Sequence, residues 1–380
     1  MKIERVSVSA LAYGGAGVCR LNDGKVAFVP GTLPGEEVEI RIIAEKKRFV
    51  QAQLVKVISP SADRREELCP LAGKCPGCCY LHCTYDLELQ WKDRQFRDFL
   101  LRSSLTSEDV FAPPFASPRE LFYRNKLLLH RDKSGDYGYF GMDNRTILPV
   151  KKCFLADERI NELLPQAAGK EALFRASAGG AALIPPGKPG VLREKIAGAG
   201  EFMVAGDGFF QNNPAVAQEL AAEVVSAVSD GSRRNILELY CGVGIFSIAL
   251  AKSDEKICCT GVEVNSGAIG FARKNARLNQ VEKQCRFFAG DAGTAAEKFS
   301  SRPDSIIIDP PRSGVESAAL EKIISLYAPQ LVYISCAADT LTRDLKKLIA
   351  SGYRIKRARV LDMFPRTAHF ESVTVLENDN

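Results

Sequence analysis

NILELYCGVGIF, residues 235–246, carries the strongest fold signal in this chain of 380 residues. It is typical of a buried apolar strand that runs into a tight turn containing Gly242 and Gly244 and then into a helix from Ile245. Glycines at such a turn let the backbone approach a ligand, and the helix N-terminus attracts polar groups. The stretch therefore predicts the cofactor-binding turn of a doubly wound sheet.

The sequence around this turn, from about residue 206, alternates between strand-like and helix-like segments. Apolar strand runs are ICCTGVEV, CRFFAG, SIIID and LVYIS, and a helical pattern follows each of them. Two adjacent β-runs, YRIKRARVLDMFP and FESVTVLE, close the chain and predict a terminal hairpin. Buried strands alternating with helices predict an α/β fold with a mainly parallel sheet. With the closing hairpin, we expect a Rossmann-like class I methyltransferase domain over residues 206–380.

Two further domains are expected before it. Residues 1–58 contain short β-branched runs separated by turn segments such as YGGAG and PGTLPGE, which predict an OB-like barrel, a common nucleic-acid platform. Residues 59–205 contain a cysteine cluster, an amphipathic helix at about 84–104 and strand-like KLLLHR and YGYFGM. We expect a small mixed α+β domain here, with its helix packed on the catalytic domain.

The composition is that of an ordinary globular protein, with 46% hydrophobic and 26% charged residues, and it argues against disorder. The net charge of +5 permits a polyanionic partner. Lys2, Glu4 and Arg5 interrupt any N-terminal apolar segment, and no apolar run approaches the length of a membrane span. We therefore expect a cytoplasmic protein that binds no membrane, in which structural disulfides are improbable.

Acidic side chains at the ends of the strands suggest the cofactor. Glu263 ends the strand in GVEV about twenty residues after the glycine turn, where a carboxylate can hold ribose hydroxyls. Asp291 follows the next strand and suits an adenine edge. The turn lacks the third glycine of G-x-G-x-x-G, so S-adenosylmethionine (SAM), which has no pyrophosphate, fits better than NAD. A glycine-rich packing turn remains the alternative.

Three more side chains suggest the reaction. SIIIDPPRSG places Asp309 at a strand end below a rigid loop, and LVYISC places Cys336 at the next strand end, as a small buried residue or a nucleophile. Glu371 and His369 lie between the last two β-runs. A cysteine, an acid and SAM together suit methylation of a pyrimidine at carbon 5. The thiolate adds to carbon 6, carbon 5 takes the methyl group, and a base removes the carbon-5 proton.

These motifs resemble the RNA uracil-5-methyltransferases, specifically the iron–sulfur branch that acts on 23S ribosomal RNA. The matching segments are FFQNN (209–213), ELYCGVGIFSIALA (238–251), IDPPRSG (308–314), YISCAADTLTRDL (333–345) and LDMFPRTAHFES (361–372). The N-terminal segment resembles a TRAM domain, so the resemblance covers nearly the whole chain. It implies Cys336 as nucleophile, Glu371 as base and Asp309 between cofactor and uracil. The residues that it implies in SAM binding, with the glycine turn, are Gln211, Tyr240, Gly242, Gly244, Glu263, Asp291 and Asp309.

The chain departs from the family at three places. Ala337 and Ala338 follow the nucleophile where the family usually has Asn-Pro or Asp-Pro, which affects placement of the base. Ile245 stands where several relatives carry asparagine, removing a polar contact to the cofactor. The middle domain is shorter than usual, which can change the RNA element that is held. Without the resemblance, an ordinary helix-start residue before Pro214 is the preferred interpretation of Gln211.

The cysteine cluster CPLAGKCPGCCYLHC, residues 69–83, has C-x₅-C-x₂-C spacing, unlike the close pairs of most zinc sites. Three close cysteines and one distant cysteine are a usual layout for a [4Fe–4S] cluster, and this arrangement resembles the iron–sulfur branch. The expected ligands are Cys69, Cys75, Cys78 and Cys153. Cys79 and Cys83 are then non-ligands, and the cluster is a structural staple. Zinc, or no metal, remains an alternative.

We therefore expect a SAM-dependent RNA uracil-5-methyltransferase, acting on 23S ribosomal RNA as a monomer. A transfer RNA substrate is an alternative. Amino methylation of adenine or guanine is another, because D-P-P-R echoes the N-P-P loop of such enzymes, although that chemistry does not use Cys336. A non-catalytic RNA-binding protein that retains the scaffold is a third, which SCAADT favours and the presence of Cys336 and Glu371 opposes.

Overall fold

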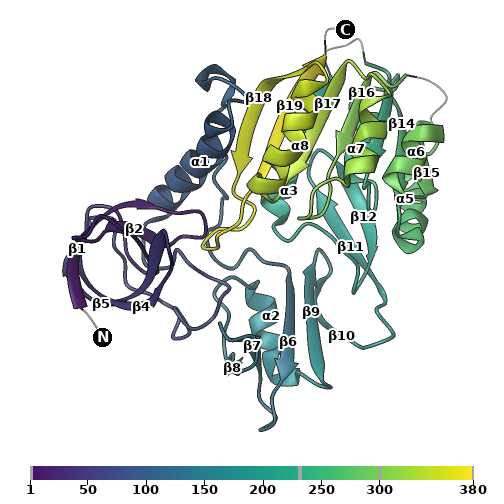
Figure 1. Ribbon diagram of the computed structural model, residues 1–380. Coiled ribbons are helices and arrows are strands. Elements are labelled where there is room, and N and C mark those ends of the chain that lie inside the picture. The colour runs from purple at the N-terminus through teal and green to yellow at the C-terminus, as the bar shows by residue number, and fades with distance from the viewer. Residues whose placement is uncertain (1–2, 230–232, 299–301, 379–380) are drawn as a thin grey trace.

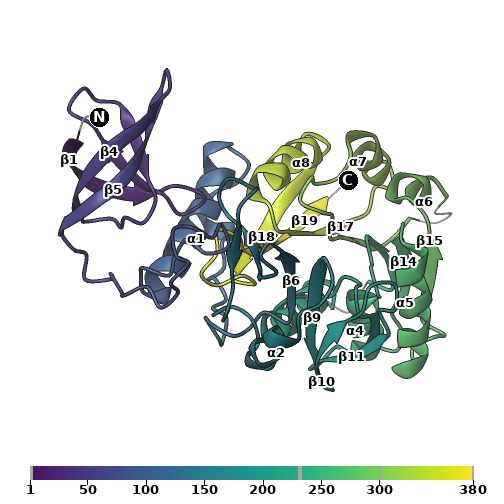
Figure 2. The same ribbon diagram turned by 90° about the horizontal axis from the view of Figure 1, so that it is seen from below.

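The computed structural model describes residues 3–229, 233–298 and 302–378. An N-terminal barrel, a five-stranded sheet and a seven-stranded sheet form its three main β-structures (Figure 1). The helix α1 (Tyr85–Arg102) runs between the barrel and the seven-stranded sheet, as the view from below also shows (Figure 2). In the described part of the chain, none of the helices is both long and apolar enough to cross a membrane.

The barrel is closed in the strand order β1-β2-β3-β5-β4. Its strands are β1 (Ile3–Leu11), β2 (Gly17–Arg20), β3 (Val26–Val29), β4 (Glu37–Glu45) and β5 (Phe49–Ser59). Alternate side chains of β1 are buried and exposed, so Val6 and Val8 point inward against Val38 and Ile40 of β4. The apolar residues that alternate along the sequence of β1 thus face the inside of the barrel, and the residues between them face the outside.

The middle of the chain begins with residues 60–84, which form no helix or strand, and continues into α1. Thr84 caps this helix, since its side-chain oxygen accepts a hydrogen bond from Leu87 N at 3.4 Å. The five-stranded sheet has the order β10-β9-β6-β7-β8, and α2 packs on it. The elements that follow α1 in this part of the chain are the 3₁₀ turn η1 (Glu108–Val110), β6 (Lys126–Arg131), β7 (Tyr137–Phe140), β8 (Ile147–Pro149), α2 (Glu158–Leu163), the 3₁₀ turn η2 (Leu164–Gln166), β9 (Glu171–Ser177) and β10 (Gly180–Ile184).

The C-terminal part starts with the hairpin β11 (Val191–Ile196) and β12 (Gly200–Ala205) and with α3 (Pro214–Val228). The seven-stranded sheet follows in the order β15-β14-β13-β16-β17-β19-β18, with only β19 antiparallel to both of its neighbours. Its elements are β13 (Asn235–Leu239), α4 (Ile245–Ser253), β14 (Cys258–Glu263), α5 (Ser266–Leu278), β15 (Cys285–Ala289), α6 (Ala292–Lys298), β16 (Ser305–Ile308), α7 (Ser317–Ile324), β17 (Gln330–Ser335), α8 (Ala338–Ala350), β18 (Tyr353–Leu361) and β19 (Glu371–Asn378).

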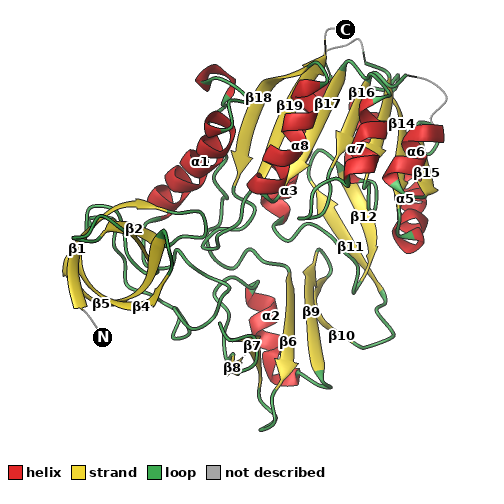
Figure 3. Ribbon diagram, viewed as in Figure 1, coloured by secondary structure: helices red, strands yellow, loops and turns green. Residues whose placement is uncertain are grey.

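Helices cover both faces of this sheet (Figure 3). The helices α3, α4 and α5 bury one face, and α6, α7 and α8 bury the other. Phe96 and Leu100 extend α1 into the second of these cores, where the helix contacts α8 and β18. Phe202 of β12 packs into the first core, so this hairpin supports the seven-stranded sheet. The domain boundaries at residues 58 and 205 stay predictions.

Candidate active site

The carboxyl ends of the five parallel strands meet at one edge of the seven-stranded sheet, where ligands bind in open α/β folds. The antiparallel strand β19 begins at this same edge. In the pairing of β17 with β19, Ser335 lies opposite Ser372, so Cys336 and Glu371, each one residue further toward the edge, lie across from one another. Parallel pairing of Leu239 with Ile308 likewise brings the segments after β13 and β16 together. Topology thus gathers residues from distant parts of the sequence.

The turn after β13 has the backbone that its glycines predict. Gly242 has φ +51° and Gly244 has φ +88°, both in the left-handed region that favours glycine. A Cβ atom on Gly242 would meet no atom within 4 Å, whereas one on Gly244 would lie 2.7 Å from Cζ of Phe287. Gly242 therefore leaves open space at the turn, and Gly244 allows close packing of α4 against β15.

The carboxylate of Glu263 is fixed beside this turn. Its Oε2 accepts a hydrogen bond from Gly242 N at 3.3 Å, and its Oε1 accepts one from Asn265 N at 2.8 Å. Asp291, at the end of the neighbouring strand, accepts hydrogen bonds from Gly293 N at 2.9 Å and Thr294 N at 3.1 Å. Both acids are thus oriented by backbone amides at the edge where a nucleoside cofactor would lie.

Two further residues expected to contact the cofactor lie near this edge. Tyr240 follows β13 with φ +63°, and burial raises its pKa to about 12. Gln211 precedes α3 and is only 7% exposed; its backbone carbonyl accepts a hydrogen bond from Asn125 Nδ2 at 3.0 Å. The neighbouring Phe209 is 69% exposed, which is unusual for a phenylalanine. The segment before α3 therefore joins the five-stranded sheet to the catalytic edge.

Cys336, Glu371 and Asp309 influence one another electrostatically. Glu371 is buried, and its Oε2 has no hydrogen-bond partner among the described residues. Burial and then the charge of Asp309 raise the pKa of Glu371 well above its usual range, against the opposing effect of Arg312. Burial raises the pKa of Asp309 to about 7. Burial and then Glu371 raise the pKa of the Cys336 thiol to about 11, while Arg312 lowers it. At neutral pH the resting thiol is protonated.

Arg312 and Tyr13 are site residues that the sequence analysis missed. Arg312 lies within the quoted motif IDPPRSG and acts electrostatically on Cys336, Glu371 and His369. It contributes to lowering the pKa of His369 to about 4, after the larger effect of burial. The motif position of Arg312 was a usable signal, because a cation beside a cysteine favours the thiolate.

Tyr13 comes from the barrel, in the loop between β1 and β2. Its ring makes edge contacts with Phe370 and Phe99, at centroid distances of 6.2 and 5.4 Å. The charge of Cys336 is among the causes that raise the pKa of Tyr13, after burial. The ring is 39% exposed, so the barrel presents an aromatic surface next to the proposed nucleophile. In the sequence, the YGGAG segment showed only a turn.

A buried ionic network holds the loop that leads into Glu371. Lys92 of α1 is fully buried, and its Nζ donates to Glu88 Oε1 at 2.7 Å, Asp362 Oδ1 at 2.8 Å and the carbonyl of Phe364 at 3.1 Å. Glu88 Oε1 also accepts a hydrogen bond from Arg366 N at 2.6 Å. The amphipathic pattern predicted the helix, but it did not reveal these buried charges.

The structure shows what the two substitutions in the family motifs, at Ala337–Ala338 and at Ile245, contact. Ser335 Oγ accepts a hydrogen bond from Ala337 N at 3.1 Å, so a serine closes the turn after Cys336. The helix α8 then begins without a side-chain cap at Ala337. Ile245 is 8% exposed and packs in the core with α3 and α5, where an asparagine would have to bury a polar group.

The predicted cluster ligands lie near one another. Burial raises the pKa of the Cys78 thiol above its usual range, and so do, in decreasing order, Cys153, Cys75 and Cys69. Leu71 packs with the core of the five-stranded sheet and thereby places the cysteine loop against it. Among the residues that the structure describes, no three His, Cys, Asp or Glu side chains are arranged to hold a metal ion.

The other two cysteines of the stretch lie elsewhere. Cys79 packs against the barrel, since a Cβ atom on Gly15 would lie 2.9 Å from its sulfur. Cys83 is buried, and its thiol donates to the carbonyl of Tyr80 at 3.3 Å. Both belong to a small apolar cluster with Leu11 of β1. Their places match the expectation that they are not ligands, which stays a prediction.

Known sequences resemble this chain along its whole length. The family described as tRNA (Uracil-5-)-methyltransferase matches residues 197–379, and the TRAM domain matches residues 2–55. An uncharacterized RNA methyltransferase of Aquifex aeolicus is 30% identical over 424 residues, covering 98% of each chain. The 23S rRNA (uracil(1939)-C(5))-methyltransferase of Vibrio parahaemolyticus is 28% identical over 429 residues, covering 98% of this chain and 96% of the relative.

A solved structure shows the same fold. The tRNA (uracil-54, C5)-methyltransferase of Pyrococcus abyssi, in complex with S-adenosyl-L-homocysteine, has a TM-score of 0.75 at 23% identity and covers 98% of this chain and 99% of its own. The predicted methyltransferase fold with an N-terminal barrel is confirmed, whereas an iron–sulfur domain is not shown. From these matches and the site geometry, the chain belongs to the RNA (uracil-5-)-methyltransferase family, with SAM as its methyl donor and a TRAM domain at its N-terminus.

Proposed function

We propose that this enzyme methylates carbon 5 of a uridine in 23S ribosomal RNA, with Cys336 as nucleophile and Glu371 as base. The observation that carries this proposal is the position of Cys336 opposite Glu371, whose buried carboxyl has no hydrogen-bond partner among the described residues. The Vibrio relative, named for a 23S rRNA uracil, supports the ribosomal substrate. We also propose a monomer that works in the cytoplasm, where ribosomal RNA is found.

The reaction needs two steps from the chain's own residues. The thiol of Cys336 loses its proton to water, and its sulfur bonds to carbon 6 of uracil. The double bond between carbons 5 and 6 opens to an enolate, which makes carbon 5 nucleophilic. Bound SAM supplies the methyl group to carbon 5. Glu371 then removes the carbon-5 proton, the bond between sulfur and carbon 6 breaks, and the ring double bond returns. Glu371 acts as a base in its ionised form, which the charge of Arg312 favours by lowering its pKa. Burial, which raises that pKa, makes the ionised carboxylate a stronger base.

The residues at the glycine turn fit SAM. Gly242 leaves open space beside the turn, where the backbone can approach the cofactor. We propose that Glu263 binds ribose hydroxyls and that Asp291 and Gln211 bind other parts of the cofactor. The backbone amides that hold both carboxylates at the sheet edge support this assignment. Asp309 would lie between cofactor and uracil. Each of these assignments predicts that substitution weakens SAM binding.

We further propose that Cys69, Cys75, Cys78 and Cys153 hold a [4Fe–4S] cluster. The donor set fits, because four cysteine thiolates are the usual ligands and the other three thiols act electrostatically on Cys78. The cluster would fasten residues 60–84 to the five-stranded sheet as a structural staple.

Protein purified without oxygen is then expected to be brown and to contain about four irons per chain. Cys78→Ala should lose the iron and the visible absorbance, while Cys258→Ala, an exposed thiol on β14, should keep both. Zinc in place of iron would support the zinc alternative, and a colourless, metal-free protein that remains folded would refute the staple.

Methyl transfer from labelled SAM to 23S, 16S and transfer RNA tests the function. Wild-type enzyme should label 23S RNA, and nucleoside analysis should find 5-methyluridine. Cys336→Ala should abolish labelling, with Cys258→Ala as the matched control. Glu371→Gln should instead trap an RNA–protein adduct that survives denaturation, because the carbon-5 proton stays in place. Labelling of transfer RNA alone would favour the transfer RNA substrate. Undiminished labelling by Cys336→Ala would refute the mechanism. RNA binding without methyl transfer by the wild-type protein would favour a non-catalytic function.

A further inference from the structure

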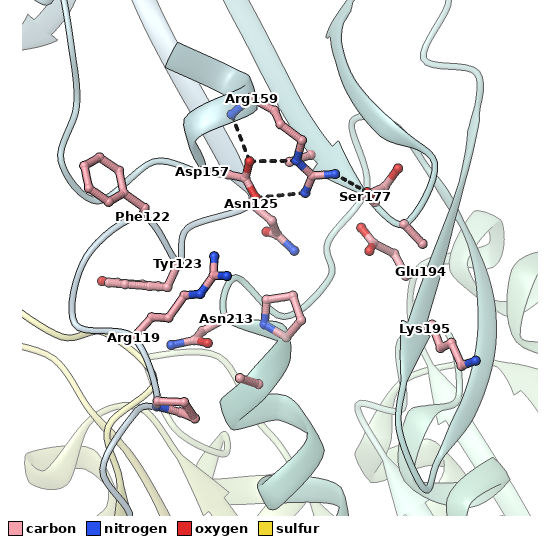
Figure 4. Close-up of a pocket in the computed structure, with 15 residues that line it drawn as sticks. Arg119, Phe122, Tyr123, Asn125, Asp157, Arg159, Ser177, Glu194, Lys195 and Asn213 are labelled. Carbon is pink, nitrogen blue, oxygen red and sulfur yellow. Dashed lines mark hydrogen bonds and ion pairs between the residues drawn. The ribbon is translucent and has the colours of Figure 1, made fainter. Parts of the chain in front are cut away.

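A cavity of about 360 Å³ lies between the five-stranded sheet and the start of α3 (Figure 4). Residues from the segment before β6, the start of α2, the end of β9, the strand β11 and the start of α3 line it. Cys336, Glu371 and Asp309 are not among these lining residues, all of which the structure describes. Its size is within the range of small-ligand sites, so it has room for a ligand of nucleotide size.

The rim of the cavity carries excess positive charge. Its two acidic side chains are already paired with arginines, at 2.8 and 3.2 Å respectively: Asp157 with Arg159 and Glu194 with Arg175. Arg119 and Lys195 form no ion pair in the described part of the chain. Figure 4 shows these two cations on opposite sides of the cavity. The balance of charge favours an anionic group at the rim.

The inner wall is aromatic and polar. Phe122 and Tyr123 line it, and Phe122 has φ +55°, a conformation that a bulky residue adopts only where its surroundings impose it. Asn125 also lines the cavity, and its buried Oδ1 accepts no hydrogen bond from the described residues. Tyr123 is only 5% exposed and its hydroxyl donates to the carbonyl of Pro365 at 2.9 Å, so Phe122 is the ring left for stacking. An aromatic ring for stacking and an amide for hydrogen bonding are groups that proteins use to bind unstacked RNA bases.

The cavity shares a wall with the catalytic edge. Asn125 donates hydrogen bonds from its backbone N to Asn212 O and from its Nδ2 to Gln211 O, both at 3.0 Å. Asn213, at the start of α3, donates from Nδ2 to the carbonyl of Met363 at 3.4 Å, in the loop that leads to Glu371. A ligand in the cavity would therefore lie next to the segments expected to hold SAM and the target uridine.

We propose that this cavity binds a nucleotide that flanks the target uridine, with its base against Phe122 and the phosphates on its two sides near Arg119 and near Lys195. The inference rests on the proposed function, since it takes the methylated RNA as the ligand. An enzyme that holds both the target and a neighbouring base reads the sequence around the target. The cavity is then a specificity site.

Removal of the two rim cations tests the phosphate contact. Arg119→Ala and Lys195→Ala are expected to raise KM for RNA with kcat unchanged. Each should also reduce the slope of log KM against log salt by about 0.7, the value for one phosphate contact on a single strand. Lys283→Ala, an exposed cation outside the cavity, is the matched control and should change neither quantity. Unchanged KM and slope in both variants would overturn the proposal.

Filling the cavity tests the base contact. Ala178 is an exposed lining residue, so Ala178→Trp can occupy the space without disturbing the core. In wild-type enzyme, an abasic substitution at one flanking position should raise KM by a factor between about 5 and about 150, the loss expected for one stacked base. Ala178→Trp should show this loss already and no further loss with the abasic RNA, while its affinity for SAM stays at the wild-type value.

The outcomes separate this inference from the proposed function. Wild-type enzyme that methylates RNA but shows no sensitive flanking position would refute the cavity alone. Weakened SAM binding in Ala178→Trp would mean that the cavity belongs to the cofactor site, which also contradicts the proposal. Wild-type enzyme that labels no RNA would refute the proposed function, and filter binding of RNA to the rim variants would still test the cavity.

Discussion

Lys92→Met is expected to destabilise the protein and to slow removal of the carbon-5 proton. The ammonium group of Lys92 is fully buried and holds two buried carboxylates, Glu88 and Asp362, as well as the carbonyl of Phe364. Methionine retains most of the side-chain volume but leaves Asp362 without its cation and Glu88 with Arg366 alone, whose Nη1 lies 3.4 Å from Glu88 Oε2. Breaking a buried ion pair from one side typically costs about 3–5 kcal/mol of unfolding free energy, and we expect a loss of this size.

Urea unfolding measures this loss directly. Trp91, the only tryptophan of the chain, precedes Lys92 on α1 and reports on the helix by fluorescence. Arg102→Met is the matched control, because Arg102 lies on the same helix and its ion pair with Asp98 is largely exposed to solvent. Exposed pairs contribute little, so this variant should unfold close to the wild-type urea concentration.

The catalytic effect follows from the loop that Lys92 holds. If that loop positions Glu371, Lys92→Met should accumulate the RNA–protein adduct as Glu371→Gln does, which a purely structural change would not cause. The triple variant Glu88→Gln, Lys92→Met, Asp362→Asn removes all three charges, and Arg366, which loses Glu88, keeps its ion pair with Glu120. It should regain much of the stability, so it can be assayed if the single variant unfolds. The reasoning is refuted if Lys92→Met matches Arg102→Met in stability and no adduct accumulates in either Lys92 variant.

Three further outcomes follow from the site geometry. Gly244→Ala should lower the unfolding free energy by about 1–3 kcal/mol and weaken SAM binding in calorimetry. The backbone φ of +88° disfavours alanine, and the new Cβ would lie 2.7 Å from Cζ of Phe287. A wild-type stability together with a wild-type SAM affinity would contradict this prediction. The rate at which iodoacetamide alkylates Cys336, followed by mass spectrometry, should rise about tenfold per pH unit from about pH 7 to about pH 10. The reason is that only the thiolate reacts and burial raises the pKa of this thiol to about 11. A rate that levels off near pH 8 would argue against burial of the thiol. Tyr13→Ala should raise KM for RNA about tenfold through loss of stacking, whereas the control Tyr13→Phe should keep the wild-type KM. If Tyr13→Ala has the same KM as Tyr13→Phe, the barrel is not part of the RNA site.

Much of the catalytic edge could be predicted from sequence. Each parallel strand and its following helix produce a local pattern, and because the helix returns the chain, all such strands run in one direction and end at one edge of the sheet. The local pattern is therefore enough to place Glu263, Asp309 and Cys336 at strand ends. Their chemical roles came from the resemblance to a family, because position alone does not distinguish a nucleophile from a small buried cysteine.

Residues that act through distant contacts could not be predicted in this way. Lys92 is charged and lies on an amphipathic helix, where a charged residue normally faces solvent. Its partner Asp362 is 270 positions away. Tyr13 lies in a glycine turn whose local pattern contains no information about the strand that it approaches. For both residues, burial and neighbours follow from the docking of separate elements.

The amino-acid sequence by itself determined the succession of strands and helices along the chain, the N-terminal barrel and the sheet edge that carries the glycine turn. It could do so because hydrophobic periodicity and turn chemistry are local properties of the chain. Only the tertiary structure decided that Glu371 faces Cys336 with an Oε2 that has no hydrogen-bond partner among the described residues. It also decided that Lys92 holds the loop before Glu371 and that a cationic cavity lies beside Gln211. Such arrangements depend on which distant side chains share a low-dielectric space, and packing of the whole chain sets that.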